Sequence, residues 1–242
     1  LPTIGGNIRV GGSNIFVTEA CEYTNSFLSF YPTMEVILNI EADHLDFFKD
    51  IDDIRHSFRL FAENTAPDGV IVLNGAIEQH EAITEGLSAK IVTYGLSADN
   101  DFYASDISYN EKGCASFLAH EGDTTIGQIT LSIPGEHNVQ NALAAIALCT
   151  QMKIPVTSII SGLSAFHGTK RRFEKKGTVG GITIIDDYAH HPTEIQATIR
   201  AASKLDFEHV HVLFQPHRYS RTESLAREFG PAFDDADSVI VM

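Results

Sequence analysis

The sequence predicts an α/β fold with a mostly parallel β-sheet and a small antiparallel insert. In its first part, short apolar runs alternate with a segment of helical periodicity, which is the βαβ pattern of a parallel sheet. Over residues 94–131 the pattern changes to short alternating runs separated by turn residues, as in antiparallel hairpins. The alternation of strands and helices resumes after Gly168, and we therefore expect a domain boundary there.

Three apolar runs in the first part are expected to form buried strands, over residues 14–18, 35–40 and 69–73. Between the second and the third run, apolar side chains recur every three or four residues, which predicts a helix over residues 51–64. Together these elements indicate parallel strands joined by helical crossovers.

The antiparallel insert contains the runs "CASFLAH" and "IGQITLSI", with turns expected at residues 111–113 and 121–123. A small-residue segment, "HNVQNALAAIALCT", follows and predicts a helix. A second helix is expected at about residues 156–165, just after Pro155. These two helices end the first predicted domain.

In the last part of the chain, strands and helices alternate again. "GGITIIDD", "HVHVLFQ" and "SVIVM" are expected to form strands. "HPTEIQATIRAA" predicts a helix with Pro192 near its first turn, and "SRTESLAREF" predicts another.

Composition and charge exclude several classes of protein. With 242 residues and 43% hydrophobic content, the chain can bury a substantial core. The longest apolar run, residues 142–149, is far shorter than the roughly 18 residues that a membrane span needs, and no signal sequence opens the chain. We therefore expect a cytoplasmic protein with no membrane partner. A formal net charge of -15 also disfavours binding to nucleic acid, and three cysteines without CxxC spacing indicate neither a disulfide framework nor a thiolate zinc site.

The stretch "ILNIEADHLDFF" places carboxylates and a histidine directly after a predicted strand. In parallel sheets, ligands bind outside the carboxyl ends of the strands, and Glu19 also follows such an end. A hard divalent cation bound to phosphates needs few protein ligands, which Glu19 with Asp43 or His44 can supply. Helix capping and solvation of an acidic loop explain the same residues equally well.

Three further stretches carry candidate chemistry. Asn138 and Asn141 share one face near a helix start, where carboxamides can pair with adenine or simply cap the helix. In "GTKRRFEKK" the guanidinium groups can bind phosphate, although a solvated basic loop is the more common cause of such a run. In "IIDDYAHHPTE" a zinc site is conceivable, but adjacent histidines seldom face one ion and no HxxxH accompanies them.

Six stretches occur along the chain in this order: "FVTEACEYTNSFL", "ILNIEADHLDFF", "IPGEHNVQNALAAIA", "GTKRRFE", "DDYAHHPTE" and "FQPHRYSRT". Together they strongly resemble the Mur ligases of peptidoglycan synthesis, and the resemblance covers essentially the whole chain. It implies an ATP-dependent, amide-forming ligase with a UDP-binding domain, a central ATPase domain and a Rossmann-like C-terminal domain. Residues 1–168 correspond to the central domain, and residues 169–242 to a truncated C-terminal domain.

The resemblance implies that ATP and Mg²⁺ are the cofactors. The family's nucleotide contacts correspond to His137, Asn138 and Asn141 at the adenine, to Asp187 at the ribose and to Arg172 at the phosphates. Glu19 and His44 match the magnesium ligands. No GxxxxGK[ST] phosphate loop occurs, so we expect this chain to be a piece of a longer enzyme that is inactive by itself.

The resemblance places His190 and Arg218 where the C-terminal domain approaches the phosphate, the substrate carboxylate and the incoming amino acid. With Arg172 they are the expected catalytic residues. "DDYAHHPTE" and "FQPHRYSRT" resemble most closely the members that act on UDP-N-acetylmuramate in the bacterial cytoplasm. The expected amino acid is L-alanine, joined through an acyl phosphate.

Three alternatives stay open. A related Mur ligase attaches a recycled tripeptide to UDP-N-acetylmuramate, and it shares most of these motifs. The chain also fits a nucleotide-binding module without turnover. A metal hydrolase built on His190 and His191 is the third alternative.

Overall fold

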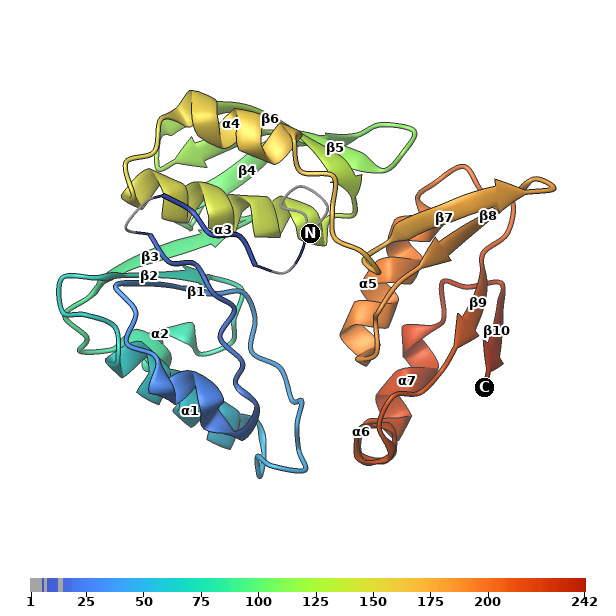
Figure 1. Cartoon of the computed structure of the whole chain (residues 1–242), viewed down its shortest axis with the longest axis horizontal. Coiled ribbons are helices and arrows are strands. Elements are labelled where there is room, and N and C mark those ends of the chain that lie inside the picture. The colour runs from blue at the N-terminus through green and yellow to red at the C-terminus, as the bar shows by residue number, and fades with distance from the viewer. Residues whose placement is uncertain (1–5, 7, 13–14) are drawn as a thin grey trace.

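The computed structural model describes residues 6, 8–12 and 15–242, and its elements form two groups (Figure 1). The first group, from the kinked 3-10 segment η2 (Tyr23–Ser29) to helix α4 (Val156–Ser164), surrounds a six-stranded sheet. The second group runs from β7 (Glu174–Val179) to β10 (Ser238–Val241) and lies beside the first. We call these groups the N-terminal and the C-terminal module. The expected boundary at Gly168 falls in the segment between them.

The N-terminal module contains one mixed sheet with the strand order β1-β2-β3-β4-β5-β6. The bounds are β1 (Met34–Ile37), β2 (Val70–Asn74), β3 (Lys90–Gly95), β4 (Phe102–Tyr109), β5 (Cys114–Glu121) and β6 (Thr124–Pro134). Pairing is parallel from β1 to β4 and antiparallel from β4 to β6. The predicted antiparallel insert is therefore present, and it continues the parallel sheet instead of forming a separate one.

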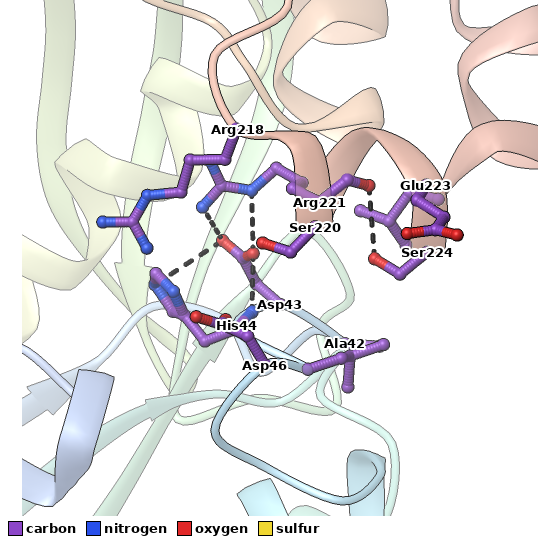
Figure 2. A pocket seen from close by; sticks show the side chains of 11 residues that line it. Ala42, Asp43, His44, Asp46, Arg218, Ser220, Arg221, Glu223 and Ser224 are labelled. Atoms are coloured by element: carbon purple, nitrogen blue, oxygen red, sulfur yellow. Dashed lines mark hydrogen bonds and ion pairs between the residues drawn. The ribbon is translucent and has the colours of Figure 1, made fainter.

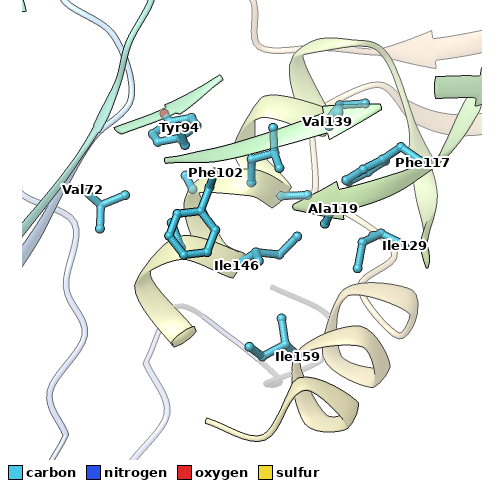
Figure 3. Close-up of a cluster of buried hydrophobic side chains, with 14 of the residues drawn as sticks. Val72, Tyr94, Phe102, Phe117, Ala119, Ile129, Val139, Ile146 and Ile159 are labelled. Atoms are coloured by element: carbon cyan, nitrogen blue, oxygen red, sulfur yellow. The ribbon is translucent and has the colours of Figure 1, made fainter. Parts of the chain in front are cut away.

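Helices cover both faces of this sheet, because the strand β2 is apolar on both sides. Val70 and Val72 belong to a core beneath α3 (His137–Gln151), which also contains Tyr94 and Phe117 (Figure 3). Ile71 and Leu73 face the other way, into a second core beneath α1 (Ile51–Glu63) and α2 (His80–Thr84). Side chains alternate along a strand, so neighbouring residues of β2 belong to different cores.

The C-terminal module is smaller. β7 and β8 (Ile182–Asp186) form an antiparallel hairpin, and β9 (His211–Phe214) pairs in parallel with β10. The helices are α5 (Pro192–Ser203), α6 (Tyr219–Ser224) and α7 (Ala226–Ala232). Ile195, Ile199 and Phe214 form its core with Ala232. The first residue of α5 is Pro192, as the sequence predicts.

Two predictions about elements are wrong. Residues 15–18 form no strand, and Ile15, Phe16 and Val17 are exposed, whereas Asn14 lies outside the described residues. A strand needs a partner, and in the described part of the chain β1 pairs only with β2. The helix expected over residues 220–229 is divided into α6 and α7 at Leu225, whose backbone leaves the helical region.

Several elements follow no pattern that the sequence analysis recognised, namely η2, α2, β3 and β7. β7 lies partly within "GTKRRFEKK", where its exposed lysines gave no apolar alternation. The remaining predicted helices and strands are found, with ends that differ by a few residues. In the ranges described, no helix has both the length and the apolar character needed to cross a bilayer.

Candidate functional site

Loops from both modules meet around a cavity of about 210 Å³, which is lined by residues 42–46 and by residues of α6 and its start (Figure 2). Residues 38–48 follow the carboxyl end of β1, where a parallel sheet exposes polar loop residues. Arg218, at the N-cap of α6, and Arg221, within α6, both line the cavity opposite this loop. The N-terminal module therefore contributes carboxylates to the cavity, and the C-terminal module contributes two guanidinium groups and the carboxylate of Glu223.

His44 is held in this loop by neighbours on each side. Its backbone lies in the left-handed region, with φ 55°. Its Nε2 atom is 3.2 Å from a carboxylate oxygen of Glu22, and its ring packs on Tyr23 with a centroid distance of 4.5 Å. Its Nδ1 atom is buried, and no described residue offers it a hydrogen bond. A buried imidazole nitrogen without a partner is the kind of atom that a ligand or metal satisfies.

Glu19, the other expected magnesium ligand, has an exposed side chain and forms no ion pair with His44 in the described structure. Glu22 takes the place beside the imidazole, although the sequence analysis did not select it; its position three residues after Glu19 in "TEACEY" was the available signal. Among the described residues, no three His, Cys, Asp or Glu side chains converge into a metal cage. The magnesium roles of Glu19 and His44 stay predictions.

Asp43 connects the loop to the C-terminal module. Its two carboxylate oxygens accept hydrogen bonds from Nε and Nη2 of Arg221, each at 2.9 Å. Only 7% of the Arg221 side chain is exposed. Burial by itself would raise the pKa of Asp43, but the hydrogen bonds from Arg221 and from the His44 N–H hold that pKa below its ordinary value. Arg221 was not among the residues expected from the sequence, although it stands in the stretch "FQPHRYSRT".

The expected adenine contacts lie together at the start of α3. The Asn138 carboxamide donates to the carbonyl of Pro134 at 2.7 Å and lies 3.1 Å from Nε2 of His137. Asn141 donates to Asn138 at 3.3 Å. Neither asparagine caps the helix, because Glu136 occupies the N-cap position and its side chain makes no capping hydrogen bond. The two carboxamides are instead joined in a short chain of hydrogen bonds that ends at the Pro134 carbonyl.

Asp187 and Arg172 face this group from the C-terminal module. Burial lowers the pKa of His137, while the charge of Asp187 raises it and that of Arg172 lowers it further, so both charges lie within reach of the imidazole. Asp187 accepts hydrogen bonds from the backbone N–H groups of Phe173 and Ala189, each at 2.7 Å. The Arg172 guanidinium is half exposed and pairs with Glu194 at 3.1 Å.

His190 and His191 face different partners. Nδ1 of His190 lies 2.8 Å from the carbonyl oxygen of Tyr188, whereas Nδ1 of His191 lies 3.3 Å from a carboxylate oxygen of Glu41 in the N-terminal module. This divergence gives no support to a hydrolase metal site built on the two histidines. Arg218 stacks on Tyr23 at 5.2 Å, beside the His44 loop.

The structure thus brings the expected site residues to the junction of the two modules in two groups. One group contains His44 with Arg218 opposite, and the other contains His137, Asn138 and Asn141 with Asp187 and Arg172. Of the remaining expected residues, His190 shares the Glu194 carboxylate with Arg172, and Glu19 lies apart from both groups. The roles assigned to these residues are not tested by their positions.

Two family models match the chain: the Mur ligase middle domain over residues 3–149, and the Mur ligase, glutamate ligase domain over residues 171–242. A UDP-N-acetylmuramate–L-alanine ligase of Agathobacter rectalis is 53% identical over 241 residues, which cover 100% of this chain and 52% of that protein. The chain spans about half the length of the curated relatives it matches.

Solved structures show the same similarity. The UDP-N-acetylmuramate-alanine ligase MurC from Thermotoga maritima superposes with a TM-score of 0.72 at 28% identity, covering 90% of this chain and 47% of that one. A murein peptide ligase from Psychrobacter arcticus gives a TM-score of 0.64 at 28% identity, covering 89% of this chain and 44% of that one.

Proposed function

The chain belongs to the Mur ligase family, and from this membership we propose that it takes part in the ATP-dependent joining of L-alanine to the carboxylate of UDP-N-acetylmuramate. The observation that carries the proposal is the gathering, at one junction, of residues that match the family's nucleotide and substrate contacts. The 53% identity to a relative of that name supports the choice of amino acid. The proposal places the reaction in the bacterial cytoplasm as a step of cell wall synthesis, with no nucleic acid or membrane partner.

We assign residues 1–168 to the ATP-binding middle domain and residues 169–242 to the C-terminal domain, which the matched ranges 3–149 and 171–242 support. In this assignment Asn138 and Asn141 contact adenine from α3. Asp187 meets the ribose across the junction, and Arg172, whose side chain is half exposed, contacts the phosphates. The nucleotide then bridges the two modules.

The first chemical step joins two anions. The muramoyl carboxylate attacks the γ-phosphorus of ATP, the bond to the β-phosphate oxygen breaks, and ADP leaves with that electron pair. Arg172 and Arg218 screen the repulsion between the anions and hold them in line. The product of this step is an acyl phosphate.

In the second step, the neutral amine of L-alanine attacks the carbonyl carbon of the acyl phosphate. The tetrahedral intermediate collapses with phosphate as the leaving group, and the nitrogen loses a proton. Nδ1 of His190 donates to the Tyr188 carbonyl, because a carbonyl oxygen only accepts, so in the neutral imidazole the lone pair lies on Nε2. We assign proton acceptance to that Nε2 atom. Closing the modules excludes water, which would otherwise hydrolyse the acyl phosphate.

The residues present are compatible with Mg²⁺, as the buried and unpartnered Nδ1 of His44 and the nearby carboxylates indicate. Mg²⁺ typically takes one or two protein ligands with phosphate oxygens and water, so the lack of a three-residue cage in the described chain is consistent with this ion. By resemblance to the family His44 and Glu19 would hold it, and the exposed Glu19 side chain would then have to approach the imidazole, which it does not pair with in this structure. When bound, the ion supplies positive charge to the transferring phosphate.

Product identification by mass tests the proposal. The full-length protein receives UDP-N-acetylmuramate, ATP and magnesium with either L-alanine or the recycled tripeptide. We expect UDP-N-acetylmuramoyl-L-alanine, with loss of product in Arg172→Ala. Arg200→Ala, which removes an exposed ion pair with Asp235 in the same module, is the matched control and should keep full activity. Preference for the tripeptide would instead support the murein peptide ligase alternative, and absence of any product would refute the ligase proposal.

A further inference from the structure

The Asp43 carboxylate accepts hydrogen bonds from both modules. Its Oδ1 atom accepts the backbone N–H of His44 at 2.7 Å and Nε of Arg221 at 2.9 Å, and its Oδ2 atom accepts Nη2 of Arg221 at 2.9 Å (Figure 2). Arg221 belongs to α6, far away in the sequence. A guanidinium that binds both oxygens fixes the plane of the carboxylate, as a lysine ammonium does not.

The orientation of this carboxylate matters for His44. A residue without Gly's freedom is strained at φ 55°, and the bond from its N–H to Asp43 stabilises that conformation. The same backbone conformation directs the imidazole toward Glu22 and Tyr23 and leaves its buried Nδ1 atom without a hydrogen-bond partner among the described residues. If Asp43 turned, His44 would lose the acceptor that holds its backbone.

Two other ion pairs between the modules occur among the described residues, and both are longer. Glu41 and His191 approach to 3.3 Å, and Glu136 and Lys204 to 3.5 Å with both side chains about half exposed. Exposed ion pairs contribute little, whereas loss of one partner from a buried pair leaves an uncompensated charge. The pair of Asp43 and Arg221, which makes two hydrogen bonds of 2.9 Å, is the shortest and most buried of these contacts.

We propose that Asp43 and Arg221 form a clamp between the modules, which couples docking of the C-terminal module to the position of His44. Both are positioning residues that act through His44, and the effect on turnover rests on the ligase function proposed above. The clamp also sets the orientation of α6, and with it the side of Arg218 that faces the cavity. The site is thus complete only when the C-terminal module is docked.

Two measurements on the full-length protein test the clamp: steady-state kinetics with varied magnesium, and hydrogen exchange in residues 38–48 and 215–225. Arg221→Ala and Asp43→Asn should each lower kcat roughly tenfold or more and raise the magnesium concentration needed for half-maximal rate. Each should also speed exchange in both segments. The double variant should resemble either single variant, because the two residues act as one unit.

Arg200→Ala is the control, since it removes an exposed ion pair at 3.2 Å within the C-terminal module; it should change neither measurement. Should Arg221→Ala fail to fold, Arg221→Lys keeps the charge, loses the two-pronged contact, and is expected to show the same changes in reduced size.

Additive effects on kcat in the double variant would refute the proposed clamp. It would also be refuted if kcat stayed unchanged and hydrogen exchange became faster in residues 215–225 but not in residues 38–48. If the wild-type protein forms no product, the ligase proposal fails, but the exchange measurements still decide whether Arg221 holds the His44 loop.

Discussion

Glu35 makes the stability of the N-terminal module depend on pH. It lies on β1 with only 5% of its surface exposed. One carboxylate oxygen accepts a hydrogen bond from the Thr65 hydroxyl at 3.0 Å, and the other is buried with no partner in the described residues. Burial raises the pKa of Glu35 from its ordinary 4.5 to about 7, against the opposing effect of the Thr65 hydrogen bond. Near neutral pH, therefore, the folded protein retains a proton that the unfolded chain has lost.

The size and the sign of the effect follow from this difference. Between 4.5 and about 7 the folded state binds more protons than the unfolded state, so the free energy of unfolding falls as pH rises. The stabilisation is fully present below pH 4.5 and is lost as the pH passes 7. At about 1.4 kcal/mol for each tenfold change in proton affinity, the total is roughly 3 kcal/mol.

Glu35→Gln removes the proton equilibrium while keeping the shape of the side chain. The new amide adds a constant cost, because it brings buried donors, but that cost does not vary with pH. We expect the free energy of unfolding of the wild type, relative to that of the variant, to fall by roughly 3 kcal/mol between pH 4.5 and pH 7 and to be flat above about pH 8.

Urea unfolding followed by tyrosine fluorescence measures this difference, since the sequence has no tryptophan and Tyr94 is buried in the same sheet. Glu111→Gln, at an exposed turn residue, is the control and should track the wild type at every pH. A difference between wild type and Glu35→Gln that stays constant across the range would refute the reasoning.

Three further predictions concern the core and the site. Leu143→Ala, at a fully buried position beneath the sheet, should lower the free energy of unfolding by about 2–5 kcal/mol in urea titrations, and an effect below about 1 kcal/mol would contradict the packing described. Gly135 has φ 105°, and a Cβ atom added by Gly135→Ala would lie 2.6 Å from a ring carbon of His137. The substitution should displace His137 and raise KM for ATP roughly tenfold, as measured by ADP release. In the full-length protein, Glu19→Ala and His44→Ala should abolish substrate-dependent ADP release while circular dichroism stays unchanged; near-normal turnover in both would remove the magnesium assignment.

The sequence predicts elements well where one local pattern decides them. β2 has an apolar run and α1 has helical spacing, and both are found. Residues 15–18 have the same kind of apolar run, but a strand also requires a hydrogen-bonding neighbour, which local sequence does not reveal. The break at Leu225 between α6 and α7 likewise has no Gly or Pro at that position to indicate it.

The same holds for the site: residues placed by local sequence can be predicted, and contacts between distant segments cannot. His44 can be placed at the end of a strand from the sequence, because parallel sheets expose the loops at that edge. Its neighbour Glu22 and the contact between Asp43 and Arg221 depend on how distant segments dock. The family resemblance identifies residues by their type and their order along the chain. It does not show which carboxylate the Arg221 guanidinium contacts.

The continuous sheet of the N-terminal module has a consequence for how it folds. Its antiparallel half pairs strands joined by tight turns, as between β5 and β6. Its parallel half requires long crossovers, since Met34 of β1 pairs with Val70 of β2 only after the whole of α1 has intervened. Closing a short loop costs less entropy than closing a long one. The hairpins are thus the natural nucleus on which the parallel strands assemble, and pulse-labelled hydrogen exchange should protect Ile129 before Ile71.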